Sequence, residues 1–435
     1  MRDAMCNWPR FFARLRRQPG PTNSALSSVA EIRVTIERIL TTNIVPFWYP
    51  QTLDREHGGY RLHHDRRGRW KGPAPKRAIT QARTMWFFAR LARSPYGNEG
   101  HLAAAAHGFE LLRDRLWDER DGGFYWEVDA TGRVATHTDK HVISQSYALY
   151  ALVEYALTSG DASATELAQR TFALMEEYAP DPMHAGYIES FERDWTPTAS
   201  ARPTTMMGVP PSVKSLNAHL HILETYTRYL LLTGDELARQ RLVELISLLS
   251  EAVVRPNGAC TDQHQRDWTP LLAPATARVI YGHDLENVWL LMDAVDAIGE
   301  SQARLLPIYE RIVAYSLAYG GDREHGGFFA SGPLGSAADR RLKIWWAQAE
   351  ALVATLRMHR LTDDARYWES FTRTLDWVVR HQVDWRHGDW HADILPNGRV
   401  SGDKAGPWKS PYHNGRAMLC CLELLSREPL GTAVS

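Results

Sequence analysis

The 435-residue sequence has few cysteines, no excess of either charge and no long apolar run. Two of its four cysteines, Cys420 and Cys421, are adjacent, so together with Cys6 and Cys260 they do not form the spaced set of a disulfide framework. No segment approaches the roughly 18 consecutive apolar residues of a transmembrane helix. These absences exclude a disulfide-rich secreted protein and a membrane-spanning protein, and they predict a cytoplasmic location.

The charges argue against a nucleic-acid partner. The net charge is -1, and no internal stripe of lysine and arginine is present. Residues 1–28 differ from the rest, because they carry five arginines and a Pro-Gly-Pro sequence that interrupts any helix. They lack the long apolar core of a secretory signal. We expect a disordered basic leader over 1–28, with a targeting segment as the alternative.

Aromatic residues, by contrast, are abundant, with 16 tryptophans and 17 tyrosines. Aromatic rings stack on the C–H faces of sugars, and they also fill the cores of large helical proteins. The apolar fraction of 44% and the charged fraction of 23% are those of an ordinary globular protein. The aromatic content therefore indicates a large core, a carbohydrate site, or both.

A glycine-containing turn recurs six times, at intervals of about 60–75 residues. The strongest copies begin with Asp and end with a Gly-Gly pair before an aromatic residue; they are 54–60, 118–124 and 322–328. Weaker copies lie at 184–187, 256–259 and 386–390. A turn that returns at such regular intervals predicts a repeat architecture.

Between the turns, apolar residues recur with the period of an α-helix. Twelve segments have this pattern: 32–44, 78–92, 101–116, 141–157, 165–178, 215–232, 237–253, 286–298, 305–317, 345–360, 366–381 and 415–425. Two helices per turn predict an all-α fold, an (α/α)6 barrel with an inner ring of helices inside an outer ring. Extended pieces at 125–129 and 391–394 predict short β-hairpins in the loops at one end. Residues 29–435 then form a single domain; an open helical solenoid is the alternative.

Three segments place histidines at or near the starts of predicted helices: 217–221, 282–286 and 408–416. Histidine has the side-chain pKa nearest neutrality, so it can accept and return protons. A polar stripe on an apolar helix is costly in a dry core, so these stripes should face a solvated central pocket. Residues that share a helix face by spacing are Arg83 with Trp86, Asn217 with His221 and Glu224, His283 with Glu286, and His413 with Arg416.

The histidines do not form a convincing metal site. His219 and His221 are two positions apart, which places them about 200° apart around a helix. His283 and Glu286 could both bind a metal, but nothing in the sequence supplies a third ligand. We therefore predict neither a metal nor another cofactor.

Proton transfer next to a sugar aldehyde fits these residues better. Such chemistry needs a base, a second acid/base, and donors that hold the developing enediolate oxygen. Two imidazoles can epimerise the carbon without nicotinamide or metal. Glycoside hydrolysis would require a pair of carboxylates, whereas these segments are led by histidines. An (α/α)6 glycoside hydrolase or lyase, or a non-catalytic sugar-binding protein, stays open as a more distant alternative.

Four segments carry a resemblance to a known family: Lys214–Tyr226, Tyr281–Glu286, Lys343–Glu350 and Trp408–Arg416. With them the chain, from about residue 30 to 425, resembles the N-acylglucosamine 2-epimerase superfamily, and most of all its cellobiose 2-epimerases and mannose 2-epimerases. The resemblance implies an isomerase that acts on a free reducing mono- or disaccharide, as a monomer or homodimer. Aldose–ketose isomerases of the same superfamily share the histidines and remain an alternative.

The resemblance also implies roles for individual residues. His283 and His413 correspond to the acid/base pair at C2, and His221 to a third catalytic histidine that assists ring opening. The implied substrate-binding residues are Arg83, Asn217, Glu286, Trp345, Trp346 and Trp408. One segment, 201–207, is unusually apolar for a substrate-binding loop, so the identity of the sugar stays open.

Overall fold

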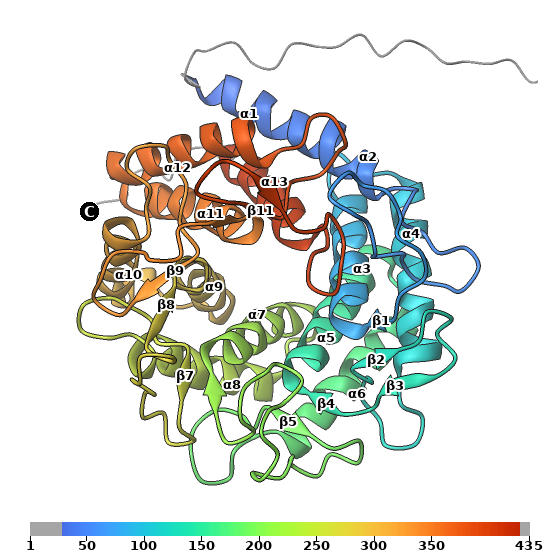
Figure 1. The fold of residues 1–435 in the computed structure, drawn as a ribbon. Helices are drawn as coiled ribbons and strands as arrows, with labels where there is room; N and C mark the ends of the chain where they lie inside the picture. Colours follow the sequence, from blue (N-terminus) through green and yellow to red (C-terminus); the bar gives the residue numbers. More distant parts are fainter. Residues whose placement is uncertain (1–27, 427–435) are drawn as a thin grey trace, which may run out of the picture.

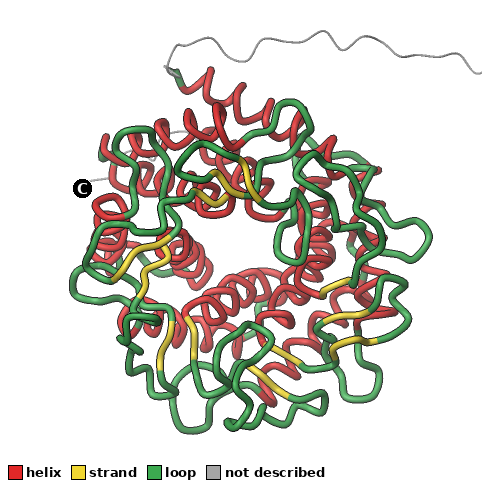
Figure 2. The backbone as a smooth tube through the Cα atoms, in the orientation of Figure 1, coloured by secondary structure: helices red, strands yellow, loops and turns green. Residues whose placement is uncertain are grey.

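The computed structural model describes residues 28–426. Residues 1–27, which make up all but the last residue of the predicted leader, and residues 427–435 lie outside the described part. Within it, helices form two concentric rings around a central opening (Figures 1 and 2). This is the predicted (α/α)6 barrel.

The inner ring consists of α3 (Ala78–Ala92), α5 (Val142–Ser159), α7 (Leu216–Thr233), α9 (Tyr281–Ile298), α11 (Trp345–Thr362) and α13 (Tyr412–Ser426). The outer ring consists of α1 (Val29–Arg38), α4 (Glu99–Leu111), α6 (Ala162–Tyr178), α8 (Glu236–Ser247), α10 (Leu306–Tyr319) and α12 (Ala365–Trp377). Each inner helix contacts the next, and α13 contacts α3, which closes the ring.

Short helical pieces complete the layers. π-helical turns continue four outer helices: η1 (Ile39–Ile44), η2 (Leu112–Leu116), η3 (Leu248–Ala252) and η5 (Val378–Gln382). The four-residue helix α2 (Val45–Trp48) follows η1, and the 3-10 turn η4 (Gln302–Arg304) precedes α10. None of the helices between residues 28 and 426 is both long enough and apolar enough to cross a membrane.

Helix ends follow from local sequence. Ser28 and Asn98 cap the outer helices α1 and α4 by accepting hydrogen bonds from backbone N–H groups of the first turn. Three inner helices end at glycines in the left-handed region, Gly160, Gly234 and Gly299, with φ between 67° and 78°. Inner helices are buried on nearly all sides, whereas the outer helix α12 has one apolar face.

The glycine turns require glycine for two reasons. Gly58 and Gly59 both have positive φ, 78° and 65°. A Cβ atom on Gly59 would also lie 2.4 Å from Cδ2 of Leu111 and 2.6 Å from Oε1 of Gln81. The turn therefore packs directly between an outer and an inner helix, which explains why this motif marks the repeat.

A buried lysine–aspartate ion pair joins each of five turns to the inner helix that follows. The Nζ of Lys76 lies 2.8 Å from Oδ2 of Asp54, and both side chains are at most 6% exposed. Equivalent pairs are Lys140 with Asp118, Lys214 with Asp181, Lys343 with Asp322, and Lys404 with Asp384. Removal of one partner would leave a buried charge unpaired, so these pairs fix the turns against the barrel.

Short strands lie over the helix starts, on the face seen in Figure 2. They are β1 (Lys76–Arg77), β2 (Glu127–Val128), β3 (Ala135–His137), β4 (Lys140–His141), β5 (Ser190–Phe191), β6 (Lys214–Ser215), β7 (Gln263–His264), β8 (Arg278–Ile280), β9 (Ser331–Pro333), β10 (Lys343–Ile344), β11 (Asp393–Ile394) and β12 (Val400–Ser401). The predicted hairpins are β2–β3 and β11–β12. The other pairs, β1–β2, β4–β5, β6–β7, β8–β9 and β10–β11, link neighbouring repeats.

Two inner helices begin earlier than the sequence pattern predicts. α9 begins at Tyr281 rather than at residue 286, and α13 at Tyr412 rather than at 415. Glycine is a poor helix former, and Gly282 interrupts the pattern at the start of α9. At the start of α13, the polar His413 and Asn414 do not continue the apolar period. A Cβ on Gly282 would lie 2.3 Å from the ring of Trp346, so glycine is needed there for close packing.

At the opposite end of the barrel, every inner helix contributes at least one charged residue to a cavity of about 470 Å³. Six of these residues, one from each helix in chain order, alternate in sign: Arg90, Glu154, Arg228, Asp293, Arg357 and Glu423. Three ion pairs join the helices two by two: Arg90 with Glu423, Arg228 with Glu154, and Arg357 with Asp293. This end is therefore held by charge pairs between neighbouring inner helices.

Candidate active site

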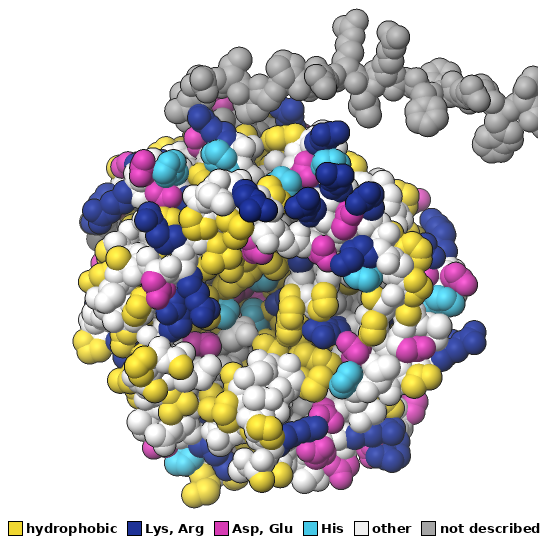
Figure 3. Space-filling model, viewed as in Figure 1, with side chains coloured by type: hydrophobic (Ala, Val, Ile, Leu, Met, Phe, Trp, Pro, Cys, Tyr) yellow, Lys and Arg dark blue, Asp and Glu magenta, His cyan; other side chains and the backbone are white. Residues whose placement is uncertain are grey.

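The nine predicted site residues line a single cavity of about 240 Å³ at the end of the barrel that carries the strands. Figure 3 shows a hollow at the centre of this face, with histidine and apolar side chains in its depth. The cavity is lined by Arg83, Asn217, His221, His283, Glu286, Trp345, Trp346, Trp408 and His413, together with Ile143 and Met207. The starts of all six inner helices thus bring together residues far apart in the sequence.

Near the start of each inner helix, one side chain, which we call the anchor, forms hydrogen bonds with a glycine turn. Gln81 accepts a hydrogen bond from the backbone N–H of Tyr60 at 2.8 Å and donates one to its carbonyl oxygen at 2.9 Å. His219 takes this role in the third repeat, where Nε2 accepts from the N–H of Tyr187 at 2.9 Å. The other anchors are Gln145, Asp284, Gln348 and Asn414.

The residue two positions beyond each anchor points about 200° away around the helix, toward the barrel axis. The six residues at this level are Arg83, Tyr147, His221, Glu286, Glu350 and Arg416. Tyr147 accepts a hydrogen bond from Arg83, and its hydroxyl lies 2.7 Å from Nε2 of His221. His219 and His221 therefore have different partners, in agreement with the expectation that they do not share a metal ion.

Arg416 connects three buried carboxylates below the cavity. Its guanidinium donates to Glu224, and Nη2 lies 2.8 Å from Oε1 of both Glu286 and Glu350. Tyr412 donates its hydroxyl proton to Glu224 at 2.6 Å. The network explains how so many charged groups remain buried in the centre of a helical protein.

The electrostatic environments of these carboxylates differ. Burial alone would raise the pKa of Glu224, but Arg416 and His221 outweigh it and hold the pKa at about 2. Burial raises the pKa of Glu286 and of Glu350 despite the nearby Arg416. Glu224 is therefore a fixed negative charge. Glu286 and Glu350 lie close together in a buried environment, which favours protonation of one of the two carboxylates.

The three cavity histidines have different hydrogen bonds. The Nδ1 of His413 lies 2.6 Å from Oε1 of Glu350, and Nδ1 of His221 lies 3.2 Å from Oε2 of Glu224. The Nδ1 of His283 is buried and makes no hydrogen bond to the described residues. Burial lowers the pKa of His221 and of His283 to about 4 and that of His413 well below its usual value, so all three are neutral at pH 7.

Tryptophans form the walls of the cavity. The Trp346 ring contacts both acid/base candidates, with ring centroids 4.9 Å from His283 and 5.7 Å from His413. Trp345 lies beside it and is half-buried. Trp408 is 41% exposed, so it stands at the rim. Aromatic surface is thus available from the depth of the cavity to its mouth.

Glu286, Glu350 and His413 bring possible metal-ligand atoms within 4.8 Å of one another. The guanidinium of Arg416 already lies against both carboxylates. A divalent cation would have to displace this buried positive charge and then lie beside it. The donor set therefore fits an arginine-centred ion network better than a metal centre.

Comparisons with known proteins agree with this geometry. The family model of N-acylglucosamine 2-epimerase (GlcNAc 2-epimerase) matches residues 58–417. The chain belongs to the N-acylglucosamine 2-epimerase family. A cellobiose 2-epimerase of Bacteroides fragilis is 30% identical over 399 residues, which cover 91% of this chain and 98% of that protein. Membership makes the chain an enzyme of the isomerase class.

Solved structures of similar proteins have the same architecture. The structure of cellobiose 2-epimerase from Bacillus thermoamylovorans B4167 is 28% identical, with a TM-score of 0.82, and the match covers 91% of this chain and 99% of that chain. A D-mannose isomerase is 20% identical, with a TM-score of 0.79, and the match covers 93% and 99% of the two chains. At that identity the second likeness shows only a shared fold.

Sequence reasoning did not assign roles to several residues at the site of this family member. Tyr147 and Glu350 complete the hydrogen bonds of His221 and His413. Met207, from the apolar segment 201–207, lines the cavity mouth. An alignment of the six repeats to one another would have placed Tyr147 and Glu350 at the same level as Arg83 and His221.

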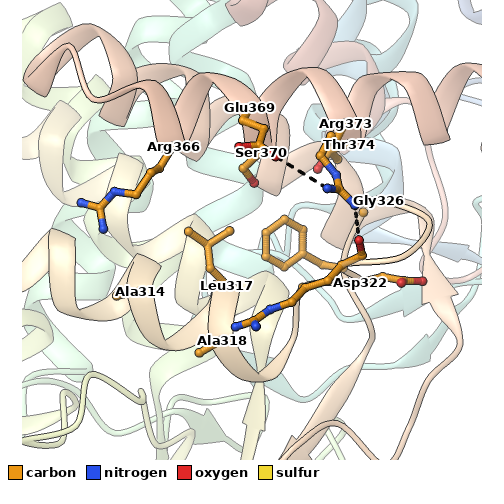
Figure 4. A pocket seen from close by; sticks show the side chains of 14 residues that line it. Ala314, Leu317, Ala318, Asp322, Gly326, Arg366, Glu369, Ser370, Arg373 and Thr374 are labelled. Carbon is orange, nitrogen blue, oxygen red and sulfur yellow. Dashed lines mark hydrogen bonds and ion pairs between the residues drawn. The ribbon is translucent and has the colours of Figure 1, made fainter. Parts of the chain in front are cut away.

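A second hollow, of about 310 Å³, lies outside the barrel, between α10, α12 and the turn at 321–328 (Figure 4). Leu317 and the stem of Arg366 line it, and Arg373 donates to the backbone carbonyl of Arg323 across one side. Its lining contains no histidine, and its polar groups serve the packing of the two outer helices. It is not part of the cavity described above.

Proposed function

We propose that this protein is a sugar 2-epimerase that interconverts glucose-type and mannose-type reducing ends. The observation that carries the proposal is the pair of neutral histidines, His283 and His413, in the first turns of α9 and α13 in one aromatic-walled cavity. The unequal hydrogen bonding of these two histidines supports different roles in the two halves of the reaction. Membership of the epimerase family supports the same activity.

In the proposed reaction, the reducing ring opens to the aldehyde. One histidine takes the proton from C2, and the electron pair of the broken C–H bond forms the cis-enediolate. The enediolate turns about the C2–C3 bond, and the other histidine returns a proton to the opposite face of C2. Because each histidine serves one face, reaction in both directions needs no other reagent.

We assign the proton-donating role in one direction to the pair of His413 and Glu350. Their 2.6 Å hydrogen bond allows Nε2 to release a proton toward the sugar while Nδ1 takes one from the carboxyl. Burial raises the pKa of Glu350, which favours the protonated carboxyl that this role needs. His283, neutral and without a hydrogen bond at Nδ1, is then the base in that direction.

Stabilisation of the enediolate is assigned to positive groups around the cavity. The Arg83 guanidinium lies beside Tyr147 and lines the cavity directly. All six inner helices begin at this end, so their N-termini add partial positive charge. We propose that Asn217 and Glu286 bind sugar hydroxyls, and that His221 assists ring opening. Both nitrogens of His221 are already hydrogen-bonded, so it would act by releasing Tyr147.

We further propose that the tryptophans bind the sugar rings. Trp345 and Trp346 would hold the reducing-end ring in the depth of the cavity, and the exposed Trp408 a second ring at the mouth. A disaccharide such as cellobiose or mannobiose, or a free hexose, would fit this arrangement. A cytoplasmic location, a monomeric or homodimeric state, and independence of metals and cofactors stay predictions.

The test is incubation of the protein in heavy water with glucose, mannose, cellobiose, mannobiose and N-acetylglucosamine, followed by NMR. Deuterium at C2 together with the 2-epimer is the expected result. Accumulation of ketose in place of the 2-epimer would assign the protein to aldose–ketose isomerisation. If none of these sugars exchanges its C2 hydrogen, the proposed function is wrong.

A further inference from the structure

Each histidine of the cavity has a carboxylate near Nδ1, but the three pairs differ in length. The distances from Nδ1 are 2.6 Å to Glu350 for His413 and 3.2 Å to Glu224 for His221. The Nδ1 of His283 lies 4.0 Å from Oδ1 of Asp262. The third pair has the partners of a hydrogen bond but is too long to be one.

Asp262 is held where it is by its own backbone. It immediately precedes β7, and its carbonyl oxygen accepts a hydrogen bond from the N–H of Leu216 at 2.7 Å. Its Oδ1 accepts from the N–H of Asn217 at 3.3 Å, in the first turn of α7. The carboxylate therefore reaches from the wall of one repeat toward the histidine of the next.

We propose that Asp262 is a positioning residue for His283 and accepts the Nδ1–H proton when sugar is bound. This hydrogen bond would fix the tautomer in which Nε2 carries the lone pair, and would stabilise the imidazolium formed when Nε2 takes the C2 proton. No covalent bond to Asp262 forms, and the proton on Nδ1 stays there. The inference rests on the proposed function, because it assigns the base its orienting group.

Other charged groups face the same two side chains. The positive charge of Arg83, on α3, disfavours protonation of His283, and Glu350, on α11, favours it. Asp284, on α9, repels the Asp262 carboxylate. Burial raises the pKa of Asp262 to about 6, so it is ionised at pH 7 and becomes neutral as the pH falls through 6.

The alternative is a purely structural role, in which Asp262 only caps α7. Asp262→Asn separates the two roles, because the amide oxygen still accepts from Asn217 while the negative charge is lost. Asp267→Asn is the matched control. Asp267 is an exposed residue of the same loop whose carboxylate likewise accepts a backbone hydrogen bond, from Thr269 at 2.9 Å.

We expect Asp262→Asn to lower kcat about tenfold to a hundredfold with little change in KM and in thermal stability. The wild-type pH profile of kcat should show a partial step near pH 6, which the variant loses, while Asp267→Asn keeps both rate and step. Asp262→Glu should recover part of the rate. Equal kcat in Asp262→Asn and wild type would overturn the proposal.

Two further measurements test the proposal if the variant does not fold or if the wild type shows no activity. If Asp262→Asn fails to fold, Asp262→Ser retains a capping oxygen without charge and is judged by the same criteria. If the wild type exchanges no sugar hydrogen, nitrogen-15 NMR of the His283 imidazole at pH 7 with a bound sugar alcohol, which has no aldehyde to react, still decides. An Nδ1–H tautomer that becomes less populated in Asp262→Asn supports the pairing, and the same tautomer in both proteins contradicts it.

Discussion

The Nδ1 atom of His413 lies 2.6 Å from Oε1 of Glu350, which stands 63 residues earlier in the sequence. Glu350 lies on α11 and His413 on α13, so the pair exists only because these two neighbouring inner helices pack against each other. Its buried carboxyl has a raised pKa, which makes this hydrogen bond the natural store for one transferable proton.

Glu350→Gln should therefore lower kcat by at least about 100-fold, because the amide cannot pass a proton to Nδ1. KM should change little, since Glu350 does not line the cavity directly. Steady-state kinetics on the preferred sugar checks this. Glu423→Gln, which alters a glutamate paired with Arg90 at the far end, is the control and should keep wild-type kcat.

His219 and His221 should respond oppositely to the same substitution. His219→Gln introduces the residue that three other repeats use as their anchor. The variant should therefore fold, and its kcat should stay within about twofold of the wild-type value. His221→Gln removes the partner of Tyr147 and Glu224 and should reduce kcat strongly. Loss of activity in a folded His219→Gln protein would count against the anchor role.

The acid limb of kcat/KM should lie well below pH 6.5. A base works only when neutral, and burial lowers the pKa of His283 to about 4. Protonation therefore begins only as the pH falls toward 4, and apart from the partial Asp262 step the free enzyme keeps its activity through pH 6. Initial rates with circular dichroism at each pH test this; a folded protein that loses all activity at pH 6.5 contradicts it.

Trp408→Ala should separate disaccharide from monosaccharide substrates. Trp408 is exposed at the rim, where we propose that a second ring stacks on it. Loss of one aromatic face costs about 1 kcal/mol, roughly a fivefold decrease in kcat/KM, for cellobiose or mannobiose. Rates with glucose and mannose should stay unchanged. Equal losses with both kinds of sugar would place the first ring, rather than the second, against Trp408.

The charge pairs at the far end predict unequal effects on stability. Glu154 is 1% exposed and pairs with both Arg93 and Arg228, so Glu154→Gln should lower the free energy of unfolding by about 3 kcal/mol. The Glu423 side chain is 39% exposed, and Glu423→Gln should cost less than about 1 kcal/mol. Urea denaturation measures both, and a larger loss in Glu423→Gln would refute the ranking.

Much of the fold could be predicted because its signals are local. Gly58 and Gly59 mark a turn that needs positive φ, and the helical period between such turns is visible in the sequence. The sequence pattern predicts both starts too late, because Gly282 lowers helix propensity in α9 and the polar His413 and Asn414 interrupt the apolar period in α13. Gly282 and Gly415 make close contacts with Trp346 and Phe87. Those contacts are tertiary and leave no local signal.

The site shows the same division. His221, His283 and His413 could be chosen from their own neighbourhoods, because polar residues at the start of an apolar helix need a solvated partner. Glu350 and Tyr147 could not be chosen in this way, since the role of each depends on a hydrogen bond to a histidine in another repeat. Arg416 was expected only to share a face with His413, whereas it joins three carboxylates from three other helices.

The anchor near each inner-helix start has a consequence for how such proteins change. Because Gln81 or His219 secures the turn, the residue two positions later does not have to hold it and can face the axis. Six such positions stand at one height around the axis, and here they hold two guanidiniums, two carboxyls, a phenol and an imidazole. The side chains at this height can therefore differ between related barrels while the turns stay the same, provided that the buried charges remain paired.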